Sequence, residues 1–227
     1  MIEDTKYWYI KNHKLFEQLT NEEVDQLCII SNMKNANKND TIFFSDSEIK
    51  KVFILKVGTV KICREDSNGK EIISELLTEG DIFGHISSTK IANEKAEYAI
   101  VISDNVKLCF FEQANFMNVL KNNPNLSLKY TDTVNEKLLS FKQKYEDLIF
   151  KDVETRVADF FKKYATHHGK INNGKLEMEM MLTHQEIADY TASSRQSVTS
   201  IVNNLVVSGK IIYEGRKKVI IPDISKL

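Results

Sequence analysis

The sequence lacks the features of a membrane protein or of a disulfide-rich secreted protein. No apolar run approaches the about eighteen residues that a membrane helix needs. The first segment, MIEDTKYWYI, carries acidic residues and has no apolar core of a signal peptide. The three cysteines, Cys28, Cys63 and Cys109, lie far apart without a CxxC pair, so neither a disulfide framework nor a zinc site is indicated. We therefore expect a cytoplasmic protein.

Clustered metal ligands and catalytic groups are also missing. Between Asp40 and Glu112 the only histidine is His85, whereas a metal-dependent oxygenase needs two or three histidines and a carboxylate together. An iron–sulfur sensor needs four clustered ligands, which three scattered cysteines do not supply. No nucleophile–base pair is visible either. We therefore expect a protein that is not an enzyme and has no metal site. The sequence indicates no particular cofactor.

The charge is unevenly distributed although the net charge is only −1. Residues 151–227 contain twelve Lys and Arg against nine Asp and Glu, whereas residues 1–150 contain nineteen against twenty-three. A basic C-terminal third is the part where a polyanion would bind.

Residues 1–122 change from a helical to a β-rich pattern. The segment KLFEQLTNEEVDQLC has helical apolar spacing, and Thr20 with Glu23 forms a capping box. From Asp40 to Glu112, short β-rich runs alternate with turn signals such as DSNGK and TEGD. This pattern predicts an antiparallel barrel or roll, and the fold class is α+β. The predicted strands are TIFF, KVFILKV, TVKICRE, EIISELL, YAIVIS and VKLCFF.

Residues 123–150 predict one long helix that begins at Pro124, where a proline fits the first turn. Apolar residues along it step by four and three, which is a heptad seam. The helix could pack on its own barrel, but its charged other faces favour a seam between two copies of the chain. The seam residues are Val134, Leu138, Phe141, Tyr145 and Leu148.

Residues 182–205, LTHQEIADYTASSRQSVTSIVNNL, predict two helices joined by a short turn. Thr183 and Glu186 form a capping box for the first helix, and Ser194 can cap the second. The second helix has a buried face of Val198, Ile201, Val202 and Leu205. Its opposite face carries only hydrogen-bonding residues that are not acidic, namely Arg195, Gln196, Thr199, Ser200 and Asn203.

An acid-free face suits a helix in the major groove of DNA, because phosphates flank it and base edges bind guanidinium, amide and hydroxyl groups. A strand pair follows, IIYEG–RKKVIIP, with Gly215 at its turn. Arg216, Lys217 and Lys218 at this turn are candidates for phosphate contacts. The pattern favours a winged helix-turn-helix over residues 151–227. A generic helical hairpin is the alternative.

The order of these segments resembles the Crp/Fnr family of bacterial transcription regulators over nearly the whole chain. LFEQLTNEEVDQL resembles the opening helices of that family, and FILKVGTVKI, NGKEI and LTEGDIFG resemble its β-roll, a double-stranded β-helix of the cyclic-nucleotide-binding type. NPNL resembles the start of its dimerisation helix, and KDVETRVADFF resembles its hinge and the first helix of its DNA-binding domain. The resemblance implies a homodimer that reads a two-fold symmetric operator and works with RNA polymerase.

The resemblance also implies roles for single residues. Ser194 matches a phosphate-contacting cap and Arg195 a base-reading arginine, whereas Gln196 and Ser200 stand where a glutamate and an arginine are usual. Because Gln196 lacks the carboxylate that accepts from cytosine, the resemblance implies a different base preference at that position. Thr183, His184 and Gln185 match positions that touch phosphate. Ala192 stands where a glycine is usual in the turn. An alanine can adopt the left-handed conformation there, at a cost in free energy.

The effector pocket departs from the cyclic-nucleotide pattern in three places. The usual Gly-Glu-Leu turn is Gly84-His85-Ile86, the Arg-Ser-Ala turn is Glu94-Lys95-Ala96, and the Thr-Ser pair of the long helix is Phe141-Lys142. A desolvated phosphate needs a compensating cation, so the residues favour an unidentified effector other than cyclic AMP. A cyclic-nucleotide regulator with an altered pocket, haem at His85, a thiol switch at Cys63 or Cys109, and a ligand-binding module without DNA activity stay open.

Overall fold

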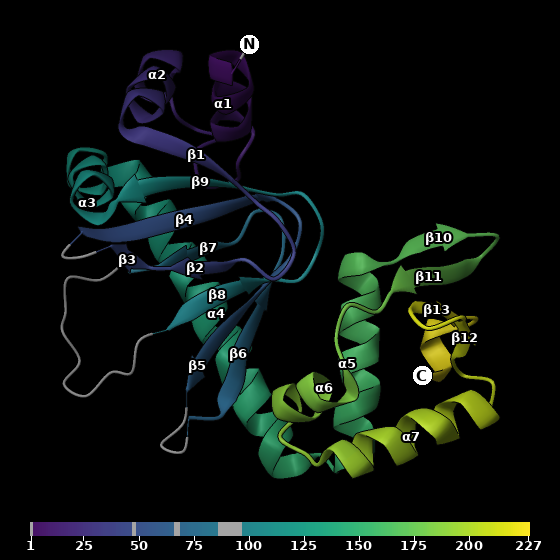
Figure 1. The fold of residues 1–227 in the computed structure, drawn as a ribbon. Coiled ribbons are helices and arrows are strands. Elements are labelled where there is room, and N and C mark those ends of the chain that lie inside the picture. The colour runs from purple at the N-terminus through teal and green to yellow at the C-terminus, as the bar shows by residue number, and fades with distance from the viewer. Residues whose placement is uncertain (1, 47–48, 66–68, 86–96) are drawn as a thin grey trace. The chain divides into compact units, whose positions relative to one another are not determined.

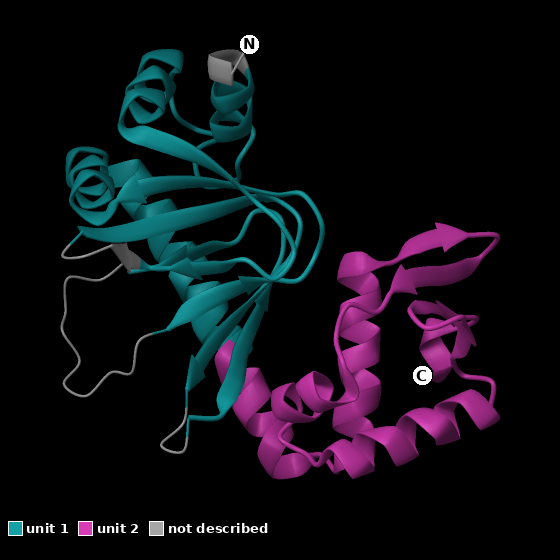
Figure 2. Ribbon diagram, viewed as in Figure 1, with its two compact units in different colours: residues 1–140 teal, residues 141–227 magenta. Residues whose placement is uncertain are grey.

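The computed structural model describes residues 2–46, 49–65, 69–85 and 97–227 (Figure 1). The chain forms two units, residues 1–140 and 141–227 (Figure 2). The division lies inside the long helix α4 (Pro124–Phe150). Within the described residues, no helix is long and apolar enough to cross a membrane.

Two antiparallel sheets form the roll that the sequence predicts in the first unit. One sheet has the order β1 (Ser31–Ala36), β9 (Val106–Glu112), β4 (Ile49–Val57) and β3 (Ser45–Asp46), and β7 (Ile82–Gly84) also pairs with β4. The other has the order β2 (Thr41–Phe43), β8 (Tyr98–Val101), β5 (Val60–Glu65) and β6 (Glu71–Leu77). The sequence did not predict β1, β3 or β7.

The interior of the roll is a continuous apolar core. Side chains that alternate along the strands of both sheets point into it, as the period of two in a strand requires. Phe53 and Phe83 stack in this core with ring centroids 5.2 Å apart. The buried members are Ala36, Ile42, Phe44, Phe53, Leu55, Val60, Ile62, Leu77, Phe83, Ala99, Val101, Val106 and Leu108.

Three short helices cover the outer side of the β1–β9–β4 sheet: α1 (Ile2–Lys11), α2 (Asn21–Ile30) and α3 (Gln113–Asn122) (Figure 1). Their apolar residues join Val52, Ile54, Cys109 and Phe111 of the sheet in a second core. The predicted capping box is present, because Thr20 Oγ1 accepts from Glu23 N and a carboxylate oxygen of Glu23 accepts from Thr20 N.

The predicted long helix begins at Pro124, and polar contacts join α4 to α3 and to the roll. Ser127 Oγ donates to Leu120 O at 2.6 Å. Lys137 Nζ donates to Ile82 O at 2.9 Å and pairs with Glu75 at 3.5 Å.

The second unit is the winged helix-turn-helix that the sequence predicts. It contains α5 (Val153–His168), β10 (Lys170–Asn172), β11 (Lys175–Glu179), α6 (His184–Tyr190), α7 (Arg195–Val207), β12 (Ile212–Glu214), β13 (Lys218–Ile221) and the short helix η1 (Ile224–Lys226). Its strands form one antiparallel sheet in the order β10-β11-β13-β12. The hairpin β10–β11 is an addition to the sequence prediction.

Candidate nucleic-acid interface and effector region

Local hydrogen bonds define where α6 and α7 begin. Thr183 Oγ1 accepts from Glu186 N, and Glu186 Oε2 accepts from Thr183 N at 2.7 Å, which completes the predicted capping box. Ser194 Oγ accepts from Ser197 N at 3.0 Å, so Ser194 is the N-cap of α7, as predicted. These caps fix the first residues of α6 and α7.

The turn between the two helices is held by backbone geometry. Ala192 has φ +49°, the left-handed conformation expected where a glycine is usual. Thr191 is buried, and its hydroxyl donates to Ile187 O at 2.7 Å. Ser193 N donates to Ala188 O at 2.9 Å. These hydrogen bonds hold the turn although an alanine occupies the left-handed position.

Helix α7 has the two faces that the sequence predicts. Val198, Val202 and Leu205 are buried, and Ile201 is partly buried. Arg195, Gln196, Ser200 and Asn203 are exposed, and Thr199 is partly exposed. Arg195–Val207 contains no acid, so the exposed face presents donors and acceptors without a negative charge.

The ring of His184 contacts helix α7 through Thr199. Thr199 Oγ1 donates its hydrogen to Arg195 O at 2.9 Å, so the 3.0 Å contact with His184 Nδ1 is made by an N–H donor on the ring. Burial and then the nearby Arg195 charge lower the pKa of His184, which favours the neutral ring. In that tautomer Nε2 is an acceptor. The predicted phosphate contact of His184 stays a prediction and requires protonation of Nε2.

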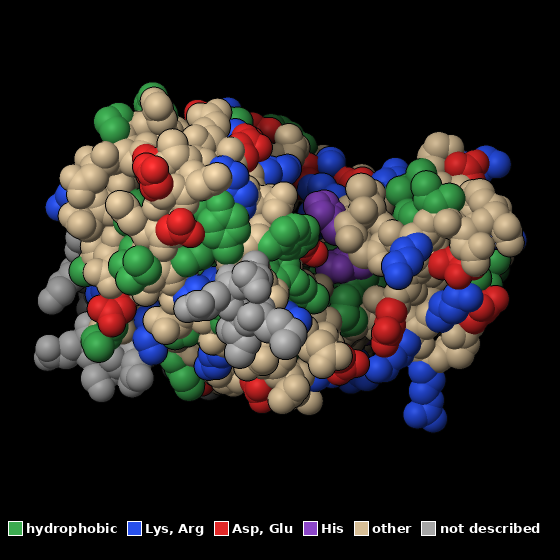
Figure 3. All heavy atoms as spheres, turned by 90° about the horizontal axis from the view of Figure 1, so that it is seen from above, with side chains coloured by type: hydrophobic (Ala, Val, Ile, Leu, Met, Phe, Trp, Pro, Cys, Tyr) green, Lys and Arg blue, Asp and Glu red, His purple; other side chains and the backbone are tan. Residues whose placement is uncertain are grey.

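The wing residues differ in their pairing. Lys218 Nζ lies 2.8 Å from Glu214 and 3.2 Å from Glu177, and Lys217 Nζ lies 3.5 Å from Glu179. Arg216 is exposed next to Gly215, and no acid of the described residues pairs with it. Basic and acidic side chains are interspersed on the face drawn in Figure 3. Arg216 is therefore the wing cation with the least internal compensation.

Gln185 completes the predicted phosphate-contacting set. It lies in the first turn of α6, and its Nε2 donates to Asp189 Oδ1 at 3.0 Å. The structure thus brings Thr183, His184 and Gln185 together at the start of α6. Ser194 and Arg195 lie at the start of α7.

The glycine turn of the roll is a packed corner. Gly80 N donates to Leu55 O at 2.8 Å, and Asp81 accepts from Thr78 N at 2.7 Å. Burial raises the pKa of the Asp81 carboxyl. Gly84 has φ +102°, and a Cβ there would lie 2.5 Å from Lys51 O, so only glycine fits.

His85 continues this corner. Its backbone N–H donates to Lys51 O at 2.9 Å. Its ring lies perpendicular to the ring of Phe44, with ring centroids 6.2 Å apart. Ile86, Glu94 and Lys95 lie outside the described residues. Phe141 and Lys142 are exposed on α4 in the second unit, and Lys142 pairs with Glu146 at 3.9 Å. The candidate effector set stays a prediction.

Two of the three thiols are buried. Cys63 and Cys109 are buried, and burial raises the pKa of Cys109, which disfavours its reactive thiolate form. Within the described residues, no group of three His, Cys, Asp or Glu side chains could hold a metal ion.

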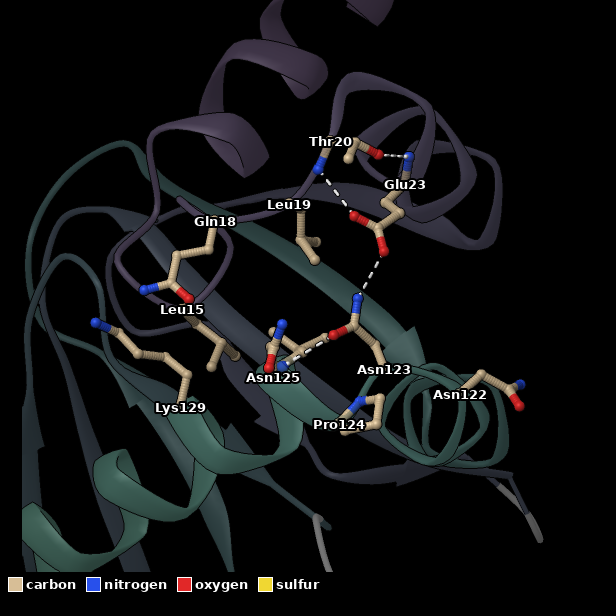
Figure 4. A pocket seen from close by; sticks show the side chains of 11 residues that line it. Leu15, Gln18, Leu19, Thr20, Glu23, Asn122, Asn123, Pro124, Asn125 and Lys129 are labelled. Carbon is tan, nitrogen blue, oxygen red and sulfur yellow. Dashed lines mark hydrogen bonds between the residues drawn. The ribbon is translucent and has the colours of Figure 1, made fainter.

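A pocket of about 360 Å³ lies where α2 begins and α4 starts (Figure 4). Asn123 links the two elements, because its Nδ2 donates to Glu23 Oε1 at 2.7 Å and its Oδ1 accepts from Leu126 N at 3.0 Å. This role of Asn123 was not predicted from the sequence, although an asparagine before a helical proline is a signal for an N-cap. The bonded polar groups indicate a structural junction.

Comparisons with known proteins match both units. The cyclic nucleotide-binding domain model matches residues 33–123, and the Crp-like helix-turn-helix domain model matches residues 155–227. A putative HTH-type transcriptional regulator, ycf28 of Porphyra purpurea, is 30% identical over 192 residues, which cover 83% of this chain and 77% of that protein. The global nitrogen regulator of Synechocystis is 27% identical over 82% of this chain and 83% of that protein.

The structure of FixK2 from Bradyrhizobium japonicum has the same fold, with a TM-score of 0.71, 16% identity, and coverage of 87% of this chain and 95% of that chain. The roll, the long helix and the winged helix together define a DNA-binding transcription regulator with a sensor-type domain. The chain belongs to the Crp/Fnr family. Regulators of this family bind DNA and act as dimers.

Proposed function

We propose that this protein is a homodimer that binds a two-fold symmetric operator, with α7 of each subunit in a major groove. The observation that carries this proposal is the acid-free exposed face of α7, fixed in place by the Ser194 cap and a buried apolar face. Arg195 is the residue that grips a guanine, and Gln196, Thr199 and Ser200 read neighbouring base edges. Thr183, Gln185, Ser194 and the wing contact phosphates.

Each segment has a separate task in this proposal. Residues 1–122 form the sensor roll, residues 123–150 join the two subunits, and residues 151–227 bind the operator. Regulation through RNA polymerase and action in the cytoplasm follow from the proposed role at promoters. An effector that favours one arrangement of the long helices changes the placement of the two recognition helices.

The effector in this proposal is not cyclic AMP. The support is that His85 stands at the position of the ribose-binding glutamate, and that the positive φ of Gly84 and its close approach to Lys51 O already require a glycine there. Thermal-shift measurements with cyclic AMP, cyclic GMP, haem and small organic acids test it. A saturable shift with cyclic AMP that His85→Ala abolishes would contradict this part of the proposal.

The test of DNA reading is fluorescence anisotropy with DNA from upstream of the protein's own gene. We expect Arg195→Ala to reduce discrimination between operator and unrelated DNA by at least about thirtyfold, because a bidentate guanine contact contributes about 1–3 kcal/mol and the dimer loses two of them. Asn204→Ala on the same helix is the matched control, since Asn204 is exposed but lies outside the proposed reading set. Unchanged discrimination by Arg195→Ala would refute the placement of α7.

A further inference from the structure

One arginine in the second unit connects two chain reversals through backbone carbonyls. Arg156 on α5 donates from Nη1 to Lys151 O at 2.7 Å, from Nε to Thr191 O at 3.0 Å and from Nη2 to Ala192 O at 3.2 Å. Lys151 follows the end of α4, whereas Thr191 and Ala192 form the turn that leads into α7. A single half-buried guanidinium thus bonds to the segment after the long helix and to the segment before the recognition helix.

The chemistry of these contacts requires a guanidinium. It has donors in a rigid planar fork, so it can bond to carbonyls on two sides at once, whereas a lysine ammonium is one point on a flexible stem. The carbonyls of Thr191 and Ala192 follow the last turn of α6, where no further helical turn supplies N–H donors to them. A cation at the C-terminal end of α6 also complements the helix dipole.

Further contacts brace the end of α4 around the same place. Lys151 Nζ pairs with Asp147 at 2.8 Å and with Asp159 at 2.7 Å, which connects α4 to α5. Lys144 Nζ lies 3.9 Å from the centroid of the Tyr190 ring, which connects α4 to α6. Residues 141–151 therefore have charged contacts to both helices that precede the turn at Ala192.

We propose that Arg156 is a positioning residue that sets the orientation of α7 relative to the end of α4. This inference rests on the proposed function, in which α4 joins the subunits and each α7 reads one half-site. The distance and rotation between the two recognition helices then depend on how each α7 is held against its own α4. Arg156 consequently determines which half-site spacing the dimer accepts, while Arg195 determines which bases it accepts.

The experiment measures operator spacing in the full-length protein. One added base pair moves a half-site by about 3.4 Å and rotates it by roughly 34°. Affinities are measured by anisotropy for the parent operator and for operators with one base pair added or removed, using Arg156→Gln and Arg156→Lys. Lys162→Gln on α5 is the matched control, because it removes a charge from the same helix without touching these carbonyls.

We expect the parent and Lys162→Gln to share a strong spacing preference. Arg156→Gln and Arg156→Lys should lower that preference by roughly tenfold, the scale of losing one or more charge-assisted hydrogen bonds. Discrimination between the operator and a version changed at the Arg195-contacted base should stay within about twofold of the parent. A loss of spacing preference with unchanged base discrimination indicates a change in the orientation of α7. Partial unfolding would lower both.

Three outcomes overturn the inference: an unchanged spacing preference in both variants, an equal loss of base discrimination and spacing preference, or full rescue of spacing by lysine. Thermal unfolding of each variant reports whether it is folded. If Arg156→Gln does not fold, Arg156→Lys, which keeps the charge and one donor group, decides the question. Failure of the parent itself to bind a two-fold site refutes the proposed function instead, so the two failures are distinguishable.

Discussion

At the scale of single residues, Ala192 shows how a local backbone conformation affects stability. Its φ of +49° costs an L-residue about 1–2 kcal/mol. We expect Ala192→Gly to raise the free energy of unfolding by about 0.5–1 kcal/mol, because the added freedom of glycine in the unfolded chain offsets part of the relief. Urea unfolding measures the difference.

Ala114→Gly is the opposite control for that measurement. Ala114 is exposed within α3, where its backbone is helical. Glycine should lower stability there by about 1 kcal/mol. If both substitutions are destabilising to the same extent, backbone strain at Ala192 is not the cause.

Lys56 is a second residue with a calculable effect. It is 3% exposed, and its Nζ donates to Tyr9 O at 3.0 Å. Burial lowers the pKa of Lys56 to about 8 from 10.5. Between these pH values the unfolded chain binds more protons than the folded protein, so the contribution of Lys56 to stability rises with pH from about 8 to 10.5 and is most unfavourable below pH 8.

We therefore expect Lys56→Met to stabilise the first unit at pH 7 by about 2 kcal/mol, which is the about 3 kcal/mol of the pKa shift less about 1 kcal/mol for the lost hydrogen bond. The gain should shrink when urea unfolding is repeated at pH 10. Lys107→Met on the exposed side of β9 is the control and should have little effect. Destabilisation by Lys56→Met at both pH values would mean that the bond to Tyr9 outweighs the burial of the charge.

At the scale of elements, the sequence predicted what is determined by neighbours in the chain. The caps at Thr183 and Ser194 and the start of α4 at Pro124 follow from side chains within three residues of each helix start. Strand β1, SNMKNA, has little apolar alternation and forms because its backbone pairs with β9, from Ser31 with Phe111 to Ala36 with Val106. Such long-range pairing overrides local propensity.

The same distinction applies to the candidate site. The faces of α7 were predictable from a period of 3.6 residues. The partners of Arg156 and of the wing lysines were not, because Thr191 is 35 residues from Arg156 and Glu177 belongs to a different strand from Lys218. From the sequence, Arg216, Lys217 and Lys218 are equal candidates for phosphate contacts. In the structure they differ, because Lys217 and Lys218 pair with acidic side chains.

This inequality of the wing residues yields a prediction about salt dependence. A phosphate contact changes the slope of log affinity against log salt by about 0.9, so one contact per subunit contributes about 1.8 in a dimer. We expect Arg216→Gln to lower the slope by nearly that amount and Lys218→Gln to lower it by less than half as much, because Lys218 must leave Glu214 and Glu177.

The measurement is a titration of operator affinity against potassium chloride for the parent and both wing variants. Lys175→Gln, at the exposed first residue of β11, serves as the charge-matched control. Equal slopes for Arg216→Gln and Lys218→Gln would show that the Lys218 ion pairs break without cost when DNA binds.

At the scale of the whole molecule, the described residues leave apolar side chains exposed along the predicted heptad seam of the long helix. Val134, Leu138, Phe141, Tyr145 and Leu148 are between 41% and 69% exposed. Burying one leucine side chain contributes about 1.5–3 kcal/mol, and a symmetric dimer buries each seam residue twice. In the proposed dimer, each subunit would bury these side chains against its partner.

We expect Leu138→Glu to raise the dissociation constant of the dimer by at least about a hundredfold, because two leucines are lost and two carboxylates are brought together. Sedimentation equilibrium measures it, and operator affinity should fall in parallel. Leu139→Glu makes the same substitution at the adjacent residue, which is 57% exposed and lies outside the apolar a and d positions of the heptad. This variant should stay dimeric. If Leu139→Glu dissociates the dimer and Leu138→Glu does not, the subunits meet on a different face of α4, and the heptad reading of this helix is wrong.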